Sequence, residues 1–257
     1  MELILPSGVA EDYRSNSQRI RVMTERWVID SIFCPGCGTS LSRFKNNEPV
    51  ADFYCTNCKE EYELKSKNGN IGKKIVNGAY TAMIDRLESE NNPNFFFLSY
   101  ERASLAIKNF LTIPKNFFVT SIIEERKALG PTARRAGWVG CNIVMKDIPE
   151  LGKIYYVQNG RIIEKKEVLN RWNNTEFIKG TRNIEARGWL LDVLLCVERL
   201  KKEEFSLAEV YRFEAYLQAK HPSNYNIQAK IRQQLQFLRD RKVIEFLGRG
   251  KYRLSNS

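Results

Sequence analysis

The 257-residue sequence contains a single histidine, His221. Zinc hydrolases that hold their metal through two histidines need more than one imidazole, and so do histidine-rich nucleases. Any Ser-His-Asp arrangement that relies on a second histidine fails for the same reason. These classes of enzyme are therefore excluded for this chain.

Long apolar segments are also absent. The longest runs, such as Phe95–Leu98, fall far short of the roughly 20 residues that a membrane-spanning helix needs. The first 14 residues lack a basic segment and turn acidic early, which is not typical of a secretion signal. We therefore expect a cytoplasmic protein, in which structural disulfides are disfavoured and paired cysteines are considered first as metal ligands.

Positive charge is in excess. The chain has 41 Lys and Arg against 30 Asp and Glu, a net charge of +11 and a pI near 9.4. An excess of this size predicts a polyanionic partner, with nucleic acid ahead of membrane because no long basic amphipathic helix stands out. The alternative is a basic soluble protein without such a partner.

Four of the six cysteines form two Cys-x-x-Cys pairs, Cys34 with Cys37 and Cys55 with Cys58, separated by 17 residues. This spacing is typical of a structural zinc site, in which four thiolates close a tetrahedron around the ion. A pair of redox dithiols is the alternative. Two further cysteines stand alone and are expected to be small buried residues.

Asp52, Glu63 and Lys65 form an Asp-x10-Glu-x-Lys pattern around the second cysteine pair. Segments 48–54 and 61–66 are rich in β-forming residues and predict two strands, with the cysteine knuckle at the hairpin tip. A hairpin centred between residues 56 and 57 pairs residue 52 with residue 61. Glu63 is then a diagonal neighbour of Asp52 on the same face, which Lys65 shares.

Two converging carboxylates suit Mg²⁺, which prefers oxygen ligands, and a nearby lysine can orient water or offset charge on a phosphate. The zinc would brace the hairpin tip, and the magnesium site would lie on the hairpin itself. The pattern alone also fits a solvated strand face. The apolar residues around Asp52, the zinc brace and the basic charge favour the catalytic interpretation.

The rest of the first 180 residues predicts a mixed α/β domain. Helical periodicity indicates helices at 16–31 and 71–88, and β-forming runs indicate strands near 95–99, 117–123, 142–146, 154–158 and 161–163. The order strand, helix, strand through residues 50–100 is the basis for the fold class. A polar stretch at 173–183 separates a domain at 1–180 from one at 181–257.

The second domain predicts a winged helix-turn-helix, with helices near 186–201, 206–220 and 226–241 and a hairpin at 243–255. It holds 15 Lys and Arg against 9 Asp and Glu, or +6 of the total charge. In this fold the third helix enters the major groove and the wing contacts the DNA backbone or minor groove. The candidate DNA contacts are Tyr225, Asn226, Gln228, Lys230, Arg232 and Gln233 on or before that helix, with Arg249, Lys251 and Arg253 on the wing.

Several segments carry a resemblance over nearly the whole chain: PVADFYC with ELKSK, NNPNFFFL, PTARRAGW followed by GCNI, KIRQQLQ followed by LRD, and IEF followed by GRGKYR. With them the chain resembles the DpnI-type methyl-directed restriction endonucleases. The resemblance implies a restriction-endonuclease-like PD-(D/E)xK nuclease domain with a zinc site, followed by a winged helix. It further implies Mg²⁺-dependent cleavage of double-stranded DNA at GATC sites that carry N6-methyladenine, by an enzyme that we expect to be a monomer in solution.

The resemblance also assigns roles. Asp52, Glu63 and Lys65 match the catalytic positions, the Leu64 carbonyl is a further magnesium ligand, and the four paired cysteines match the zinc ligands. Ala51 stands where the wider nuclease motif has proline, a position without a chemical role.

Sensing a methyl group needs an apolar wall, and the segment PTARRAGWVGC offers one. Trp138 follows Arg134 and Arg135, and we interpret the segment as a DNA-facing loop, with a buried core tryptophan as the alternative. Two other functions stay open from the residues: a zinc-stabilised DNA-binding regulator with a vestigial nuclease site, and a structure-specific nuclease that is indifferent to methylation.

Overall fold

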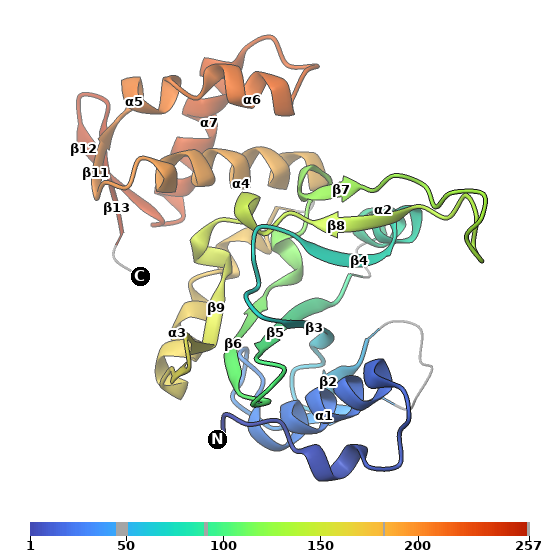
Figure 1. The fold of residues 1–257 in the computed structure, drawn as a ribbon. Helices are drawn as coiled ribbons and strands as arrows, with labels where there is room; N and C mark the ends of the chain where they lie inside the picture. The colour runs from blue at the N-terminus through green and yellow to red at the C-terminus, as the bar shows by residue number, and fades with distance from the viewer. Residues whose placement is uncertain (45–50, 90–91, 182, 256–257) are drawn as a thin grey trace. The chain divides into compact units, whose positions relative to one another are not determined.

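The computed structural model describes residues 1–44, 51–89, 92–181 and 183–255 (Figure 1). The chain folds into two compact units built from interleaved segments. The first, here called the sheet unit, consists of 1–75, 89–115 and 151–176; the second, the helical unit, consists of 76–88, 116–150 and 177–257. None of the helices among the described residues has the length and apolarity needed to cross a bilayer.

Among the described residues of the sheet unit, seven strands form one mixed sheet in the order β1-β2-β3-β5-β6-β9-β10. In the described part of this sheet, β3 and β5 are paired in parallel and the other neighbouring strands are antiparallel. The bounds are Leu41–Arg43 (β1), Phe53–Cys55 (β2), Glu61–Asn68 (β3), Asn94–Tyr100 (β5), Ile107–Ile113 (β6), Ile154–Gln158 (β9) and Arg161–Ile162 (β10). Strand β5 is buried along its whole length, which explains its continuous run of phenylalanine and leucine.

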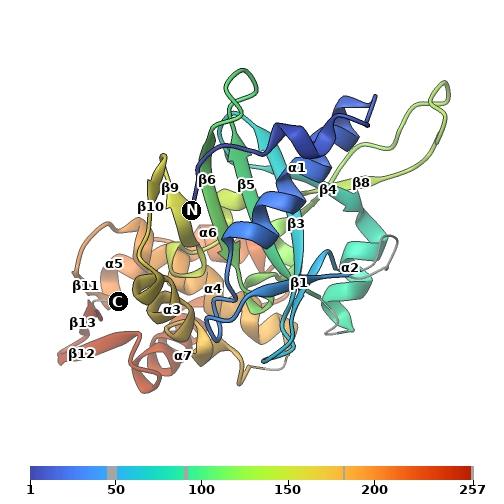
Figure 2. The ribbon, with the colours of Figure 1, turned by 90° about the horizontal axis from the view of Figure 1, so that it is seen from below.

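Helix α1 (Asn16–Ser31) covers one face of this sheet (Figure 2). It buries Met23, Trp27 and Val28 at the spacing that predicted it, against aromatic side chains of the strands such as Phe110. Burying each such side chain contributes about 1.5–3 kcal/mol. Helix α3 (Lys165–Asn173) adds Val168 and Trp172 to the same core; the sequence did not predict it.

The C-terminal part of the helical unit is a winged helix, as predicted. Its helices are α4 (Ile184–Arg199), α5 (Leu207–Tyr211), α6 (Glu214–Lys220) and α7 (Ile227–Asp240), and its sheet has the order β11-β13-β12, with bounds Glu204–Ser206, Lys251–Leu254 and Ile244–Gly248. The helix predicted at 206–220 is divided in two. It begins with a capping box, in which Ser206 and Glu209 satisfy each other's backbone N–H groups.

A second three-stranded sheet, β4-β8-β7, corrects two predictions. The helix expected at 71–88 is strand β4 (Ile75–Ala79) followed by α2 (Tyr80–Glu88), because the β-branched Ile75 and Val76 pair within a sheet instead of starting a helix. Short 3-10 turns occupy most of the expected strand at 117–123, and β7 spans Ile123–Glu125. Strand β8 spans Gly140–Ile143.

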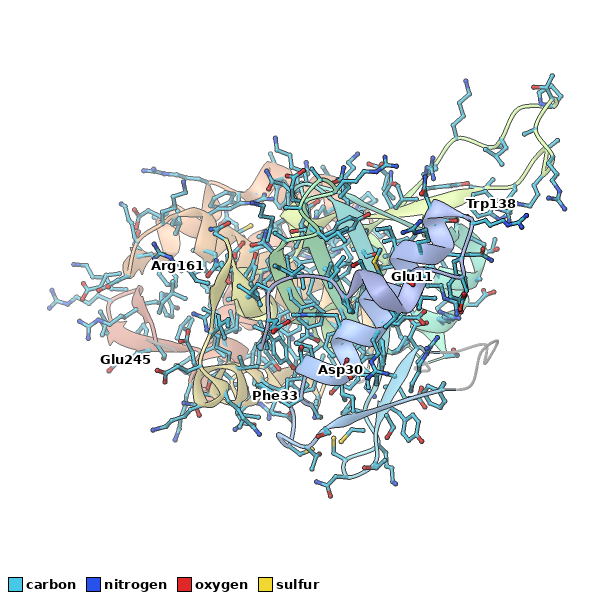
Figure 3. The ribbon with its side chains drawn as sticks, turned by 60° about the horizontal axis from the view of Figure 1, so that its bottom comes forward. Glu11, Asp30, Phe33, Trp138, Arg161 and Glu245 are labelled. Carbon is cyan, nitrogen blue, oxygen red and sulfur yellow. The ribbon has the colours of Figure 1, made fainter. Side chains whose placement is uncertain are left out.

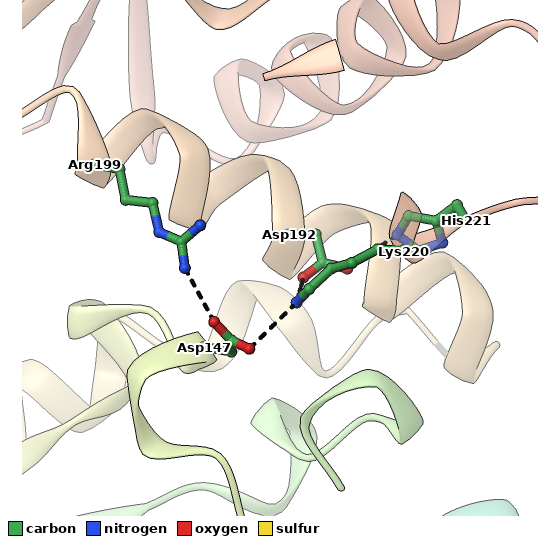
Figure 4. A network of polar contacts seen from close by, with 5 residues as sticks. All are labelled: Asp147, Asp192, Arg199, Lys220 and His221. Carbon is green, nitrogen blue, oxygen red and sulfur yellow. Dashed lines mark hydrogen bonds and ion pairs between the residues drawn. The ribbon is translucent and has the colours of Figure 1, made fainter. Parts of the chain in front are cut away.

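A network of charged side chains joins the segment after β8 to the winged helix, within the helical unit (Figure 4). Asp192 is buried on α4 and faces both Lys220 and His221, at 2.7 and 2.9 Å. Asp147 lies in the 3-10 turn Met145–Asp147 and accepts a hydrogen bond from Arg199 at 3.0 Å. The His221 ring is stacked on Trp189 of α4, with the centroids 3.8 Å apart.

Candidate active site and metal centre

The four paired cysteines converge as predicted. Their Sγ atoms all lie within 4.8 Å of one another, and two of the separations, Cys34 to Cys58 and Cys37 to Cys55, are 3.4 Å. Thiolates at about 2.3 Å from a tetrahedral zinc ion lie about 3.8 Å apart. The cluster therefore has the dimensions and the ligand chemistry of a closed four-cysteine zinc site.

The two knuckles have the same backbone geometry. In the first, the N–H of Gly38 donates to the Cys34 carbonyl at 2.8 Å; in the second, the N–H of Lys59 donates to the Cys55 carbonyl at 3.0 Å. Gly38 and Lys59 both have positive φ, 77° and 62°. Glycine suits this conformation, whereas lysine is strained in it. The rest of the second knuckle must therefore keep Lys59 in the left-handed conformation.

The thiols differ in acidity. Burial raises the pKa of Cys37, but hydrogen bonds from Thr39 outweigh it and bring the pKa to about 6. Burial raises the pKa of Cys34 well above its usual range. The contact between its Sγ and the Tyr62 hydroxyl at 3.2 Å lowers this pKa, but by less. A thiol with a low pKa is already a thiolate near neutral pH, which is the form that binds zinc.

The hairpin that follows has a register two residues away from the predicted one. Phe53 is opposite Tyr62 and Tyr54 opposite Glu61. The backbone N–H of Asp52, just before the strand, also donates to the Tyr62 carbonyl at 3.0 Å. The reason is the four-residue knuckle turn at 56–59, which moves the centre of the hairpin toward Cys58. Residues 48–50 of the predicted first strand lie outside the described residues.

The corrected register brings the three candidate catalytic residues together more directly. The backbone N–H of Leu64 donates to Oδ2 of Asp52 at 2.7 Å. On the same strand, Nζ of Lys65 lies 2.5 Å from Oε1 of Glu63, with both side chains largely buried. Tyr62 and Leu64 point to the opposite face and contact the core, so Glu63 and Lys65 share the other face.

Burial is the main cause of a raised pKa at Asp52. The hydrogen bond from Leu64 opposes it, and the negative charges of Glu63 and Glu25 add to it. A carboxyl group in this environment is stabilised in its ionised form by a bound cation. Two carboxylates and a backbone carbonyl are oxygen donors of the kind that Mg²⁺ prefers, so Asp52, Glu63 and Leu64 fit a magnesium ion.

The segment between β7 and β8 is an extended loop (Figure 1) whose base is closed by backbone hydrogen bonds, among them those from Arg126 to Gly140 and from Leu129 to Trp138. Arg134 and Arg135 lie in its exposed tip. Trp138 (Figure 3) is partly exposed and outside the buried core. The guanidinium of Arg135 lies 4.6 Å from the centroid of its ring, a cation–π contact.

Close contact with Gly140 also holds the indole in place. A Cβ atom at Gly140 would lie 2.7 Å from the Trp138 ring, so this position accepts no larger residue without displacing the indole. The loop therefore carries an aromatic ring that is held from two sides but still accessible to solvent.

The predicted DNA-contact residues of the winged helix lie at the beginning of α7 and on the wing. Tyr225 is 88% exposed. Two others have partners on neighbouring helices: Gln228 donates to Glu214 at 2.8 Å, and Arg232 donates to the Tyr211 hydroxyl at 2.6 Å. Asn226 and Gln233 are exposed, and Lys230 lies over the Trp189 ring at 5.8 Å.

The three wing residues differ in their surroundings. Arg249, with φ 50°, and Lys251 are exposed at the β12–β13 turn and the strand that follows. Arg253 forms an ion pair with Glu204 at 2.5 Å and lies 3.7 Å from Glu245. Its charge is therefore largely compensated within the winged helix.

Comparison with known families gives two matches. The model of the Dam-replacing family, DpnI, matches residues 1–181. The chain belongs to this family. The model of the Dam-replacing HTH domain matches residues 185–254, which contain the winged helix described above.

Membership of the Dam-replacing family implies a restriction endonuclease whose action depends on DNA methylation. The match at 1–181 includes the cysteine cluster, the carboxylates and the loop with Trp138, and the HTH match includes α7 and the wing. Sequence reasoning missed Tyr62, whose hydroxyl contacts Cys34, and Glu25, whose charge acts on Asp52. Neither belongs to a motif, so no local signal pointed to them.

Proposed function

We propose that this protein is a type II restriction endonuclease that hydrolyses phosphodiester bonds of double-stranded DNA at GATC sites containing N6-methyladenine. The observation that carries the proposal is the placement of Asp52, whose carboxylate accepts a hydrogen bond from the N–H of Leu64, the residue between the paired Glu63 and Lys65, in a chain of the Dam-replacing family. The enzyme is proposed to act in the cytoplasm as a monomer.

Asp52, Glu63 and the Leu64 carbonyl would hold Mg²⁺, and the ion would supply positive charge that stabilises the phosphoryl group during transfer. The Leu64 N–H keeps one oxygen of Asp52 fixed, so the carboxylate does not rotate away from the site. The Lys65 ammonium, now paired with Glu63, can donate hydrogen bonds to the attacking water or to a phosphate oxygen. Because Lys65 lies on the same strand face as Glu63, its ammonium would be within reach of both the attacking water and the phosphate.

The cysteine cluster is proposed to hold a structural zinc ion. It connects the knuckle at Cys34 to the hairpin tip at Cys55, and the same hairpin carries the carboxylates. Closing this link restricts the hairpin that carries Asp52 and Glu63. Zinc would therefore support catalysis through the shape of the hairpin, without taking part in the chemistry.

DNA is proposed to be read by both the loop with Trp138 and the winged helix. One apolar pocket discriminates a single methyl group by about 1–3 kcal/mol, or roughly ten- to two-hundredfold. Two readers that must both engage before cleavage would multiply their preferences. This arrangement would give the discrimination that an enzyme sparing unmethylated DNA requires.

The decisive experiment is digestion of one plasmid prepared from adenine-methylating and non-methylating hosts, with Mg²⁺ present. We expect fragments that map to GATC sites from the methylated plasmid alone. Equal cleavage of both preparations would favour a nuclease indifferent to methylation. Tight DNA binding without cleavage of either preparation would favour a DNA-binding regulator.

A further inference from the structure

Glu25 on α1 is a buried carboxylate that the proposed chemistry does not use. Its side chain is only 4% exposed. Arg21, one turn earlier on the same helix, donates to Oε1 of Glu25 at 2.6 Å, and Arg43 on β1 forms an ion pair with Oε2. A buried carboxylate is costly unless it is paired, and here two guanidinium groups form ion pairs with one negative charge.

The resulting cluster has a net positive charge that stays accessible. The Arg21 and Arg43 side chains are 55% and 39% exposed although both contact Glu25. Arginine presents five N–H donors in a planar fork, which matches the oxygens of a phosphate. One carboxylate therefore orients two cations whose side chains both reach the surface.

The cluster lies near the candidate catalytic residue Asp52, within the sheet unit. Arg43 is opposite Phe53 in the β1–β2 pair, and the N–H of the next residue, Phe44, donates to the carbonyl of Asp52 at 3.1 Å. Glu25 is the main cause of the raised pKa of Arg21, and the negative charge of Asp52 contributes to it. Arg21 is therefore close enough to Asp52 for their charges to interact.

We propose that Arg21 and Arg43, oriented by Glu25, bind a phosphate of the DNA backbone on the side of the site where Asp52 lies. The inference rests on the proposed nuclease function, and it adds a substrate contact made by α1 and β1. The contact would position the duplex by charge, independently of base sequence. A cation pair at this place would also offset the repulsion between the carboxylates and the DNA.

The test uses the full-length protein with Lys65→Ala, so that the DNA is bound but not cut. Affinity for a methylated GATC duplex is measured by fluorescence anisotropy in Mg²⁺ over a range of salt concentrations. Arg21→Gln and Arg43→Gln each remove a charge but keep a donor for Glu25. Each is expected to reduce the slope of log affinity against log salt by about 0.9, the value for one lost phosphate contact.

Arg26→Gln is the matched control. Arg26 lies on the same helix and has the same i,i+4 arrangement with Asp30. Its side chain is 58% exposed, against 55% for Arg21. It should leave the slope unchanged. Arg21 and Arg43 variants that are folded by circular dichroism and keep the slope of the parent would overturn the proposal, and the cluster would then be a structural link between α1 and β1.

If a glutamine variant does not fold, the charge is removed from the DNA instead. Single neutral methylphosphonates, placed in turn along the duplex, should reduce the affinity of the parent protein most near the scissile bond. Equal effects at all positions would overturn the proposal. Cleavage of the methylated duplex by the wild-type enzyme is measured separately, so a failure of the proposed function is distinguished from a failure of the phosphate contact.

Discussion

The ammonium of Lys220, at the end of α6, donates a hydrogen bond to the buried carboxylate of Asp192 on α4 at 2.7 Å (Figure 4). Burial lowers the pKa of Lys220, but the attraction of Asp192 outweighs it and the pKa is raised. Lys220 therefore stays charged, and the pair holds α4 and α6 together. The side chain of Asp192 is 2% exposed.

Asp192→Asn should destabilise the protein by about 3–5 kcal/mol, because it removes the nearer counter-charge of Lys220 and leaves it only the contact with Asp147 at 3.9 Å. The measurement is chemical denaturation followed by circular dichroism. Asp240→Asn is the control, since the Arg239–Asp240 pair is largely exposed and should contribute less than about 1 kcal/mol. Equal losses in the two variants would show that the Asp192 network does not stabilise the fold.

The cysteine cluster should bind one zinc ion for each chain. Cys55→Ser removes one of four ligands and should lower both the zinc content and the temperature of unfolding, because binding to a structural site contributes directly to folding. Cys196→Ser is the control: it is also buried but lies outside the cluster. Metal analysis measures the zinc content, and a thermal melt measures the temperature of unfolding. Full zinc retention by the Cys55 variant would contradict the assignment.

The catalytic residues should be separable from the zinc. Glu63→Ala or Lys65→Ala should reduce cleavage by at least about two to three orders of magnitude, since each removes a group that stabilises charge at the reacting phosphate. Zinc content, folding and DNA affinity should change little. A Glu63 variant that still nicks DNA in Mg²⁺ at nearly the wild-type rate would refute the assignment.

The wing should contact DNA through Arg249 and Lys251 and much less through Arg253. Replacing either of the first two by Ala should lower the salt slope of DNA binding by about one contact. Arg253→Ala should lower it less, because Arg253 already pairs with Glu204 and Glu245. If all three variants keep the salt slope of the wild-type protein, the wing makes no phosphate contact. If all three reduce the slope equally, the ion pair between Arg253 and Glu204 opens on binding.

Trp138 should contribute to methyl sensing. Trp138→Ala should reduce cleavage of methylated GATC sharply, while binding by the intact protein changes less because the winged helix is unaltered. Cleavage rates are compared on matched duplexes with two, one or no methylated adenines. An unchanged ratio between these duplexes in the variant would show that Trp138 does not sense the methyl group.

Much of the fold could be predicted because its signals are local. The helices at 16–31 and 227–240 each bury one face, and that periodicity is visible within about 15 residues. The cysteine pairs were equally clear, because two ligands lie on each knuckle. Strand β4 was mistaken for a helix, since its apolar residues fit both periods and only pairing within a sheet decides.

The amino-acid sequence by itself determined which residue types are available: four paired cysteines, the Asp52, Glu63 and Lys65 pattern, and the amphipathic helices. Tertiary structure alone decided how they meet. The turn with Lys59 in a left-handed conformation sets the register of the hairpin, and Asp52 meets the Leu64 N–H between Glu63 and Lys65. Packing of α1 on the sheet pairs Glu25 with Arg43, 18 residues further on, and no local pattern encodes that contact because it depends on how two separate elements pack.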